Sequence, residues 1–163
     1  SDSSDDSEEG VYNYNEFEFL YQNGFWAVDF LDSFLLFSYY PVSGQILGFE
    51  TLNKSYQDYE NKTVYVYSDD SEAKSELKIN LLLLTKDIQE FCLEGKTCEN
   101  AELPVKSCSA LGNAGNEEMI VIQENSQQKL ETLGNCIVIS GQKESLIKLV
   151  DEFLFRLFKI KTE

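Results

Sequence analysis

Hydrophobic and polar residues alternate near the start of the chain, which is the pattern of a half-buried β-strand. Aromatic side chains follow this alternation over residues 12–21, with one slip of phase at Asn15 and Glu16 that we interpret as a β-bulge. Asn23 and Gly24 then separate two aromatic runs and favour a tight hairpin turn, because both positions tolerate positive φ. With return strands at residues 25–31 and 34–40, the pattern predicts a three-stranded meander.

The middle of the chain changes from a period of two to a helical period. Residues 63–67 have the β-branched and aromatic composition of a short strand. Asp70 can cap a following helix by accepting the free backbone N–H groups of its first turn. Apolar residues then recur at steps of three and four up to Phe91, so we expect a helix over residues 70–91 with the four leucines at 81–84 in the core.

The last third of the chain contains two apolar runs and an apolar helix. Residues 119–123 and 136–140 predict the two strands of a central hairpin, with a further short strand around Leu130. Residues 143–160 predict the final helix. Its three phenylalanines could form a partner-binding stripe, but we favour a core position because so aromatic a sheet needs a cover: Phe153, Phe155 and Phe158.

These elements predict an α+β (or α/β) fold of two layers. The N-terminal meander, a strand–helix unit and a hairpin–helix unit would form one mixed sheet covered on one face by the two helices. We expect a single domain over residues 11–163, which is an ordinary length for one core. Residues 1–10 would be a disordered acidic tail or tether, because residues 1–9 contain only Ser, Asp and Glu.

Charge and composition exclude several classes of function. The net charge of −16 argues against nucleic acid as a partner, because phosphate binding requires clustered Lys or Arg. The same charge disfavours anionic lipid and favours solubility or a basic protein partner. The chain has no histidine, which excludes Ser-His-Asp and Cys-His catalysis and histidine-containing zinc sites.

Four cysteines allow three disulfide pairings. We favour Cys92 with Cys98, because this pair is local, and Cys108 with Cys136, because this pair would join neighbouring strands. A zinc site made by all four cysteines is the alternative, but the chain lacks the closely spaced cysteine pairs of zinc knuckles. Disulfides predict an oxidising compartment, or else the interior of a hyperthermophile.

Two sequons agree with an extracellular or cell-surface location. Asn53 and Asn61 each begin an Asn-x-Ser/Thr triplet and are the candidate glycosylation sites. Because this sequence shows no signal peptide and no membrane span, we expect an exported protein to carry a leader or an N-terminal anchor outside it.

Paired carboxylates are the candidates for acid–base chemistry or calcium binding. They fall in predicted loops or in the tail, where solvation is the default: Glu8 and Glu9, Asp69 and Asp70, and Glu117 and Glu118. Residues 2–10 lack the ligand spacing of an EF-hand, so calcium is an alternative that we do not predict, and no other metal or cofactor is expected. Asp151 lies within the apolar final helix, where we expect a polar-edge position or a local hydrogen bond.

Aromatic residues of the meander exceed what one side of a small sheet needs to bury. They form a candidate binding face for a glycan, a peptide or a neighbouring subunit: Tyr12, Tyr14, Tyr21, Trp26, Tyr39 and Tyr40. The alternative is that most of them line the core beneath the helices.

Three motifs carry a resemblance that spans nearly the whole chain after the acidic tail. They are Tyr14-Asn15-x-Phe17-x-Phe19, Glu102-Leu103-Pro104-x-x-x-Cys108 and Asn135-Cys136-Ile137-x-Ile139-x-Gly141. The chain resembles an uncharacterised family of secreted or membrane-anchored domains from small-genome archaea of the DPANN type. Members commonly end the last helix with Leu-Gly-Ile, where this chain has Phe158-Lys159-Ile160. The resemblance implies an extracytoplasmic, usually N-terminally anchored domain and no catalytic residues.

The leading hypothesis is a non-enzymatic structural or assembly domain of the cell envelope, or a secreted one, that acts through protein–protein contacts. Its basis is the combination of the extracellular features, which are the predicted disulfides and the two sequons, with the absence of histidine. The alternative is an extracellular module that binds a glycan, peptide or small ligand on the aromatic face. A hydrolase using carboxylates alone ranks third, since it would need two acids facing each other across a cleft.

Overall fold

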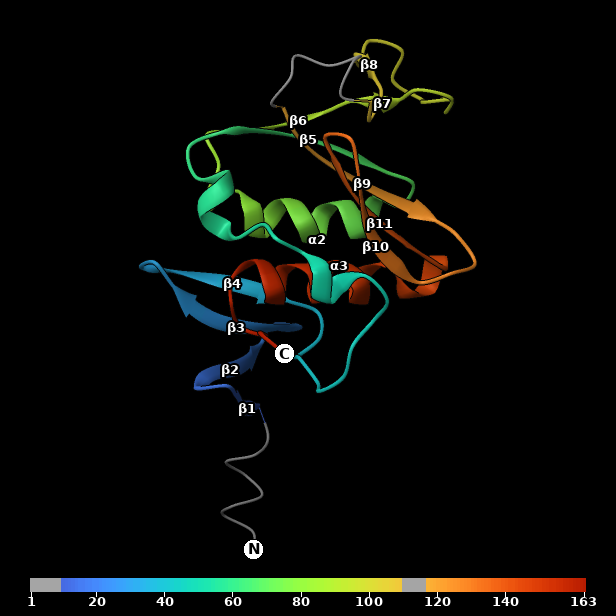
Figure 1. Ribbon diagram of the computed structural model, residues 1–163. Helices are drawn as coiled ribbons and strands as arrows, with labels where there is room; N and C mark the ends of the chain where they lie inside the picture. The colour runs from blue at the N-terminus through green and yellow to red at the C-terminus, as the bar shows by residue number, and fades with distance from the viewer. Residues whose placement is uncertain (1–9, 110–116) are drawn as a thin grey trace, which may run out of the picture.

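Two β-sheets enclose a layer of two helices in the computed structural model, which describes residues 10–109 and 117–163 (Figure 1). Sheet A has the strand order β1-β2-β3-β4, and sheet B has the order β10-β11-β9-β5-β6. The α+β class is confirmed. The strands form two main sheets rather than one, however, so the helices are buried between them instead of covering one face. The predicted acidic tail at residues 1–9 lies outside the described residues.

Sheet A is an antiparallel meander with one more strand than the sequence indicated. The hairpin turn at Asn23 and Gly24 is confirmed, with φ of 54° and 90°. Asn15 and Glu16 also both have positive φ, 50° and 71°, and join two paired strands. The slip of phase is therefore a two-residue turn rather than a bulge. The strands are β1 (Val11–Tyr14), β2 (Phe17–Gln22), β3 (Phe25–Phe30) and β4 (Ser33–Phe37).

Sheet B is mostly parallel. Strand β5 lies between β6 and β9, and β9 pairs in parallel with β11. The expected hairpin of residues 119–123 with 136–140 is therefore wrong: β11 forms its hairpin with β10, the predicted short strand around Leu130. The strands are β5 (Thr63–Ser68), β6 (Asp87–Glu90), β9 (Glu118–Glu124), β10 (Lys129–Leu133) and β11 (Cys136–Gly141).

Helix α2 (Ser71–Leu81) begins as predicted and ends much earlier. Asp70 caps it, because its Oδ2 accepts a hydrogen bond of 2.9 Å from the Ala73 N–H. The chain then turns, and the residues expected in the last part of the helix form β6 alongside β5. Leu82 and Leu83 are 57% and 36% exposed in this turn, so only two of the four leucines, Leu81 and Leu84, are buried.

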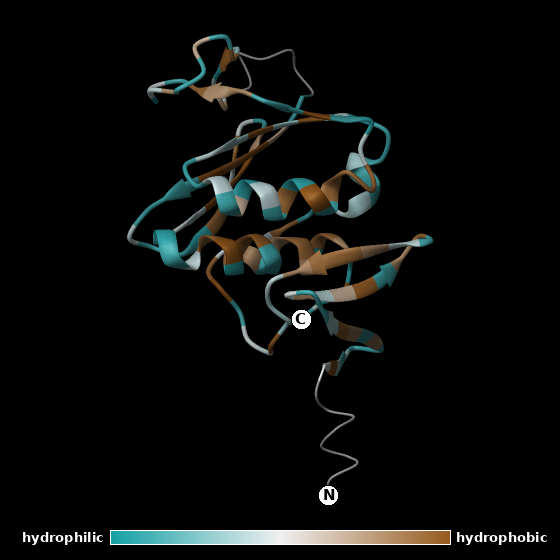
Figure 2. Ribbon diagram, turned by 180° about the vertical axis from the view of Figure 1, so that it is seen from behind, coloured by the Kyte–Doolittle hydropathy of each residue, from teal (hydrophilic) through white to brown (hydrophobic). Residues whose placement is uncertain are grey.

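Helix α3 (Leu146–Leu157) follows a short 3₁₀ turn, η4 (Lys143–Ser145). All but two of its residues are buried, because it packs on both sheets and on α2. Figure 2 shows this as a mainly brown, hydrophobic ribbon along the lower of the two helices. Phe153, Phe155 and Phe158 are at most 2% exposed, which confirms the core interpretation.

A second, smaller core lies on the other face of sheet B. Phe91, Met119, Val121 and Val138 pack there beneath the segment that contains β7 (Cys92–Leu93) and β8 (Val105–Lys106). The sequence indicated only a loop in this segment. The connection between the two sheets contains the 3₁₀ turns η1 (Phe49–Thr51) and η2 (Tyr56–Tyr59) and is anchored by buried Phe49 and Tyr59.

Candidate functional site

The structure contains the two disulfides of the favoured pairing, Cys92–Cys98 and Cys108–Cys136. Sulfurs joined in this way are not thiolate ligands, so the four cysteines do not form the alternative zinc site. The two bridges indicate an oxidising, extracellular environment. Within residues 10–109 and 117–163, no helix is both long and apolar enough to cross a bilayer.

The Cys108–Cys136 bridge joins a loop to a strand rather than two strands. Cys136 is the first residue of β11, whereas Cys108 follows β8 in the segment that covers the outer face of sheet B. The bridge closes a sequence separation of 28 residues. It therefore attaches the covering segment covalently to the start of β11, an interior strand of the sheet.

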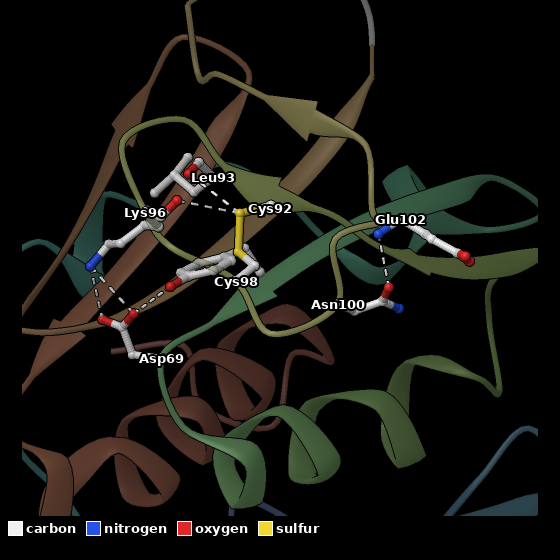
Figure 3. The surroundings of a disulfide bond; sticks show 8 residues. Asp69, Cys92, Leu93, Lys96, Cys98, Asn100 and Glu102 are labelled. Carbon is white, nitrogen blue, oxygen red and sulfur yellow. Dashed lines mark hydrogen bonds and ion pairs between the residues drawn. A yellow bond between two sulfur atoms is a disulfide. The ribbon is translucent and has the colours of Figure 1, made fainter.

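The Cys92–Cys98 bridge closes a small loop above the end of β5 (Figure 3). Asp69, which follows β5, ties this loop to the sheet: its Oδ1 accepts a 2.7 Å hydrogen bond from the Tyr67 hydroxyl and lies 3.3 Å from Lys96 Nζ. Its Oδ2 accepts a 2.8 Å hydrogen bond from the Glu124 N–H. Burial alone would raise the pKa of Asp69, but these hydrogen bonds and Lys96 together lower it.

Four of the six predicted aromatic residues come together. We call this set the aromatic cluster: Tyr12, Tyr21, Trp26 and Tyr40. Ring centroids are 4.0 Å apart for Tyr12 and Tyr40, and 5.1 Å apart for Trp26 and Tyr40. The Tyr21 and Trp26 rings, which are directly opposite each other on β2 and β3, are 5.0 Å apart.

The aromatic cluster continues the core face of sheet A to its margin. Tyr12 pairs with buried Phe19, and Trp26 pairs with buried Phe37, so both point to the side of the sheet that packs on the helices. Trp26 is half-buried, while Tyr21 and Tyr40 are 50% and 40% exposed. The cluster is therefore partly packed against the core and partly accessible.

The other two predicted aromatic residues are engaged elsewhere. The Tyr14 hydroxyl donates to Glu163 Oε2 at 3.2 Å, beside the neighbouring contact of Asn15 Nδ2 with the Ile160 carbonyl at 2.9 Å. Tyr39 lies under Lys148, with Nζ 6.0 Å from the ring centroid. The predicted face is thus divided into one cluster and two separate tyrosines.

Three buried polar side chains from the helices complete the free edge of sheet A. Asn80 of α2 exchanges two hydrogen bonds with the backbone of Leu36, at 2.7 and 2.9 Å. Glu76 accepts from the Ser38 N–H at 2.7 Å and from its hydroxyl at 2.8 Å. Asp151 of α3 accepts from the Tyr39 N–H at 3.0 Å. We call Glu76, Asn80 and Asp151 the edge-capping set, because they replace the partner strand that β4 and the residues after it lack.

Asp151 differs from both sequence expectations. It is fully buried, and its backbone partner Tyr39 is 112 residues away rather than local. Burial, followed by the hydrogen bond and charge of the Glu76 carboxyl, raises its pKa well above the ordinary value of 3.8. The Asp151 carboxyl, whose pKa is raised, therefore stays protonated to a higher pH than an exposed aspartate does.

This acid pair has the composition but not the surroundings of a carboxylate active site. Glu76 and Asp151 are 5% and 0% exposed, and neither lines the cavity at the end of β5 or the smaller one beside β2 and β3. Their oxygens accept from backbone N–H groups, so the pair is placed to hold β4 rather than to reach a substrate. The only hint of this contact in α2 is the presence of two polar residues, Glu76 and Asn80, one helical turn apart on its buried side. This spacing does not identify their backbone partners.

The other acidic candidates form ion pairs or caps. Glu117 lies 3.1 Å from Lys106, and Glu118 lies 2.8 Å from Lys54. Asp70 caps α2, while Glu8 and Glu9 lie outside the described residues. Where the structure describes the chain, no group of three or more Cys, Asp or Glu residues is arranged to hold a metal. Asn53 and Asn61 are both exposed, so their glycosylation stays a prediction that the geometry permits.

No protein-family model matches this chain, and neither a curated protein nor a solved structure matches it significantly. The resemblance to the archaeal family therefore stays a prediction that rests on its three motifs.

Proposed function

We propose that this chain is a non-enzymatic extracytoplasmic domain of the cell envelope, or a secreted one, that assembles through protein–protein contacts at the aromatic cluster. The observation that carries the proposal is the cluster itself. Tyr and Trp side chains have large, stiff and amphipathic surfaces, which are enriched where proteins bind each other. The disulfides support the location, and the buried, backbone-bonded acid pair supports a non-enzymatic role.

Charge sets the conditions under which the contact forms. Each chain carries a net charge of −16, so two copies repel each other at low ionic strength. Screening becomes strong once the Debye length falls below about 10 Å, at salt above about 0.1 M. Assembly of this domain with itself should therefore strengthen with salt, in the opposite sense to a contact between oppositely charged proteins.

Two adjacent tyrosines provide the matched experiment. Tyr40 belongs to the aromatic cluster and Tyr39 does not, yet they are 40% and 41% exposed. Sedimentation velocity at low and high salt should show a salt-promoted oligomer that Tyr40→Ser weakens and Tyr39→Ser leaves unchanged. A protein that stays monomeric at every concentration and salt would overturn the assembly proposal. Equal effects of Tyr40→Ser and Tyr39→Ser would show that the contact does not depend on the aromatic cluster.

An extracellular module that binds a glycan, peptide or small ligand is the second candidate. It is favoured by Trp26 being half-buried rather than fully buried, which leaves part of its ring accessible. Because Trp26 is the single tryptophan of the chain, its fluorescence reports on the aromatic cluster alone. Titration with neutral oligosaccharides and with short peptides should shift this emission if the cluster binds them, and unchanged emission would contradict the second candidate.

A further inference from the structure

A polar cavity of about 600 Å³ lies at the end of β5, far from the aromatic cluster and on the opposite side of the helix layer. Its volume falls within the range of small-molecule sites. It opens between the first turn of α2, the end of β6 and the loop closed by the Cys92–Cys98 bridge (Figure 3). Its polar walls include Asp69, Asp70, Lys74, Glu90, Asn100 and Lys143.

The topology of sheet B places this cavity where ligands commonly bind in parallel sheets. From β5 the chain passes through α2 to β6 on one side, while β9 pairs with β5 on the other side. From its own carboxyl end, β9 connects to β10 on the far side of β11. The connections thus leave the neighbouring strands β5 and β9 in opposite directions, which makes their carboxyl ends a topological switch point. Asp69 spans the opening at this point, because it follows β5 and accepts from the Glu124 N–H at the end of β9.

Five of the six charged residues that line the cavity belong to ion pairs, and the sixth, Glu99, is exposed. Lys74 Nζ lies 2.8 Å from Glu90, Lys143 Nζ lies 3.9 Å from Asp70, and Lys96 at the cavity edge lies 3.3 Å from Asp69. A charged ligand that bound to one of these paired groups would have to break the pair and would leave a like charge beside it. A neutral ligand with several hydroxyl groups can instead donate to the remaining carboxylate lone pairs and accept from the ammonium groups without separating them.

The loop over the cavity is held in place before any ligand arrives. The Cys92–Cys98 bridge closes it, the Cys92 N–H donates to the Pro104 carbonyl at 2.8 Å, and Asn100 Oδ1 accepts from the Glu102 N–H at 2.9 Å. Tyr67, half-buried and fixed by Asp69, adds a flat ring to the wall. Because this wall is already ordered, less conformational entropy is lost when a ligand binds. The apolar face of an aromatic ring can pack against the C–H face of a sugar.

We propose that this cavity binds a neutral saccharide unit. The site is separate from the assembly surface, because it lies at sheet B and the helix layer lies between sheet B and sheet A, which carries Trp26 (Figure 1). Failure of one proposal therefore leaves the other standing.

The test is a titration of the ¹⁵N-labelled protein with neutral sugars, followed by NMR. The probes are hexoses, pentoses, N-acetylhexosamines and their disaccharides at millimolar concentration. We expect one class to shift the backbone amides of residues 68–71 and 97–100 while the indole signal of Trp26 stays in place. Thr97→Trp should weaken this binding about tenfold or more by filling the cavity from an exposed wall position.

Glu94→Trp provides the control, since Glu94 is also exposed in the disulfide loop but does not line the cavity. It should leave the affinity unchanged. No shift of the lining amides with any sugar would overturn the proposal, as would equal losses in both variants. Binding of glycine, lysine or inorganic phosphate without binding of sugars would overturn the neutral-ligand argument, and a shift of the Trp26 indole alone would assign the sugar to the aromatic cluster.

Discussion

Sheets A and B enclose the same two helices, but they are attached to them by different chemistry. Sheet B presents Val64, Val66, Ile120 and Ile122 to the helices and is tied by the Cys108–Cys136 bridge on its other face. Sheet A also packs apolar side chains on the helices, yet its edge strand depends on the edge-capping set for its hydrogen bonds. Sheet B is thus attached to the helices by apolar contacts and carries a disulfide on its other face, whereas the attachment of sheet A also includes polar groups, one of which is an acid with a raised pKa.

This difference predicts which conditions act on which side of the molecule. Apolar burial and disulfides do not titrate in the acid and neutral range, so sheet B should respond mainly to reduction. The contact between β4 and the helices includes two carboxyls that share a buried environment, so it should respond to pH and to single polar substitutions.

Removal of the Cys108–Cys136 bridge should have the largest effect. The double variant Cys108→Ser, Cys136→Ser loses the closure of a 28-residue separation, for which chain entropy gives a destabilisation of about 3.5 kcal/mol. Urea unfolding of the oxidised protein and the variant measures this difference. If removing the Cys108–Cys136 bridge cost less stability than removing the Cys92–Cys98 bridge, the expected ranking of the two bridges would be wrong.

Substitution of Asp151 by leucine tests the polar attachment. The part-buried Tyr39 N–H would lose its acceptor, and Glu76 would lose its neighbour, so we expect a loss of about 2–3 kcal/mol. Asp151→Asn is the control, because its amide oxygen can accept from Tyr39 and its amide nitrogen can donate to Glu76. Equal stability of the leucine and asparagine variants in urea would show that the backbone contact contributes little.

The Cys92–Cys98 bridge should contribute less than the longer one. With a sequence separation of 6, the same entropy relation gives about 2 kcal/mol for Cys92→Ser, Cys98→Ser. Hydrogen exchange should show the loss of protection confined to residues 92–106, since the other bridge still holds this segment to sheet B. Faster exchange throughout sheet A would contradict this local role.

The pH dependence of stability should be the smallest effect. It should have opposite signs for Asp151, which binds beside sheet A, and for Asp69, which follows β5 of sheet B. The pKa of Asp151 is raised in the folded state, so its contribution is greatest below its ordinary value of 3.8 and is lost as pH rises towards the folded pKa. The pKa of Asp69 is lowered, so its contribution is present above 3.8 and is lost as pH falls through the folded pKa.

Two asparagine variants separate these contributions. Relative to the unmodified protein, Asp151→Asn should become more stable as pH rises, with a slope of at most about 1.4 kcal/mol per pH unit. Asp69→Asn should instead lessen the loss of stability in acid. Thermal unfolding midpoints measured across the acid and neutral range give both slopes, and slopes of the same sign would refute the assignment.

Local patterns predicted the features whose causes are local. The turn at Asn23 and Gly24, the cap at Asp70 and the Cys92–Cys98 pair depend on residues close in sequence. The Cys108–Cys136 pair was predicted correctly, but the reason given, that it joins two neighbouring strands, was wrong. The turn at Asn15 and Glu16 was misread because Glu seldom adopts positive φ, so the second turn residue gave no signal. The end of α2 was missed for a similar reason, since neither Gly nor Pro marks it.

Long-range pairing accounts for the rest of what the sequence did not reveal. Periodicity shows that a segment is a strand, but not whether it joins sheet A or sheet B, nor that β9 and β11 run parallel. The edge-capping set could not be assigned because its backbone partners are 38 to 112 residues away. Strand alternation could place Tyr12, Tyr21 and Trp26 on one face, but the separation of Tyr14 and Tyr39 from them depended on α3 and the residues after it.

The contacts of Tyr14 with Glu163 and of Asn15 with Ile160 bring the first strand and the residues after the last helix together. A domain whose entry and exit points are neighbours can be inserted into a loop of a host protein without stretching either linker. For the same reason, a short peptide could connect residues 163 and 11, and a circular permutant opened at the exposed turn of Leu31 and Asp32 should retain both sheets.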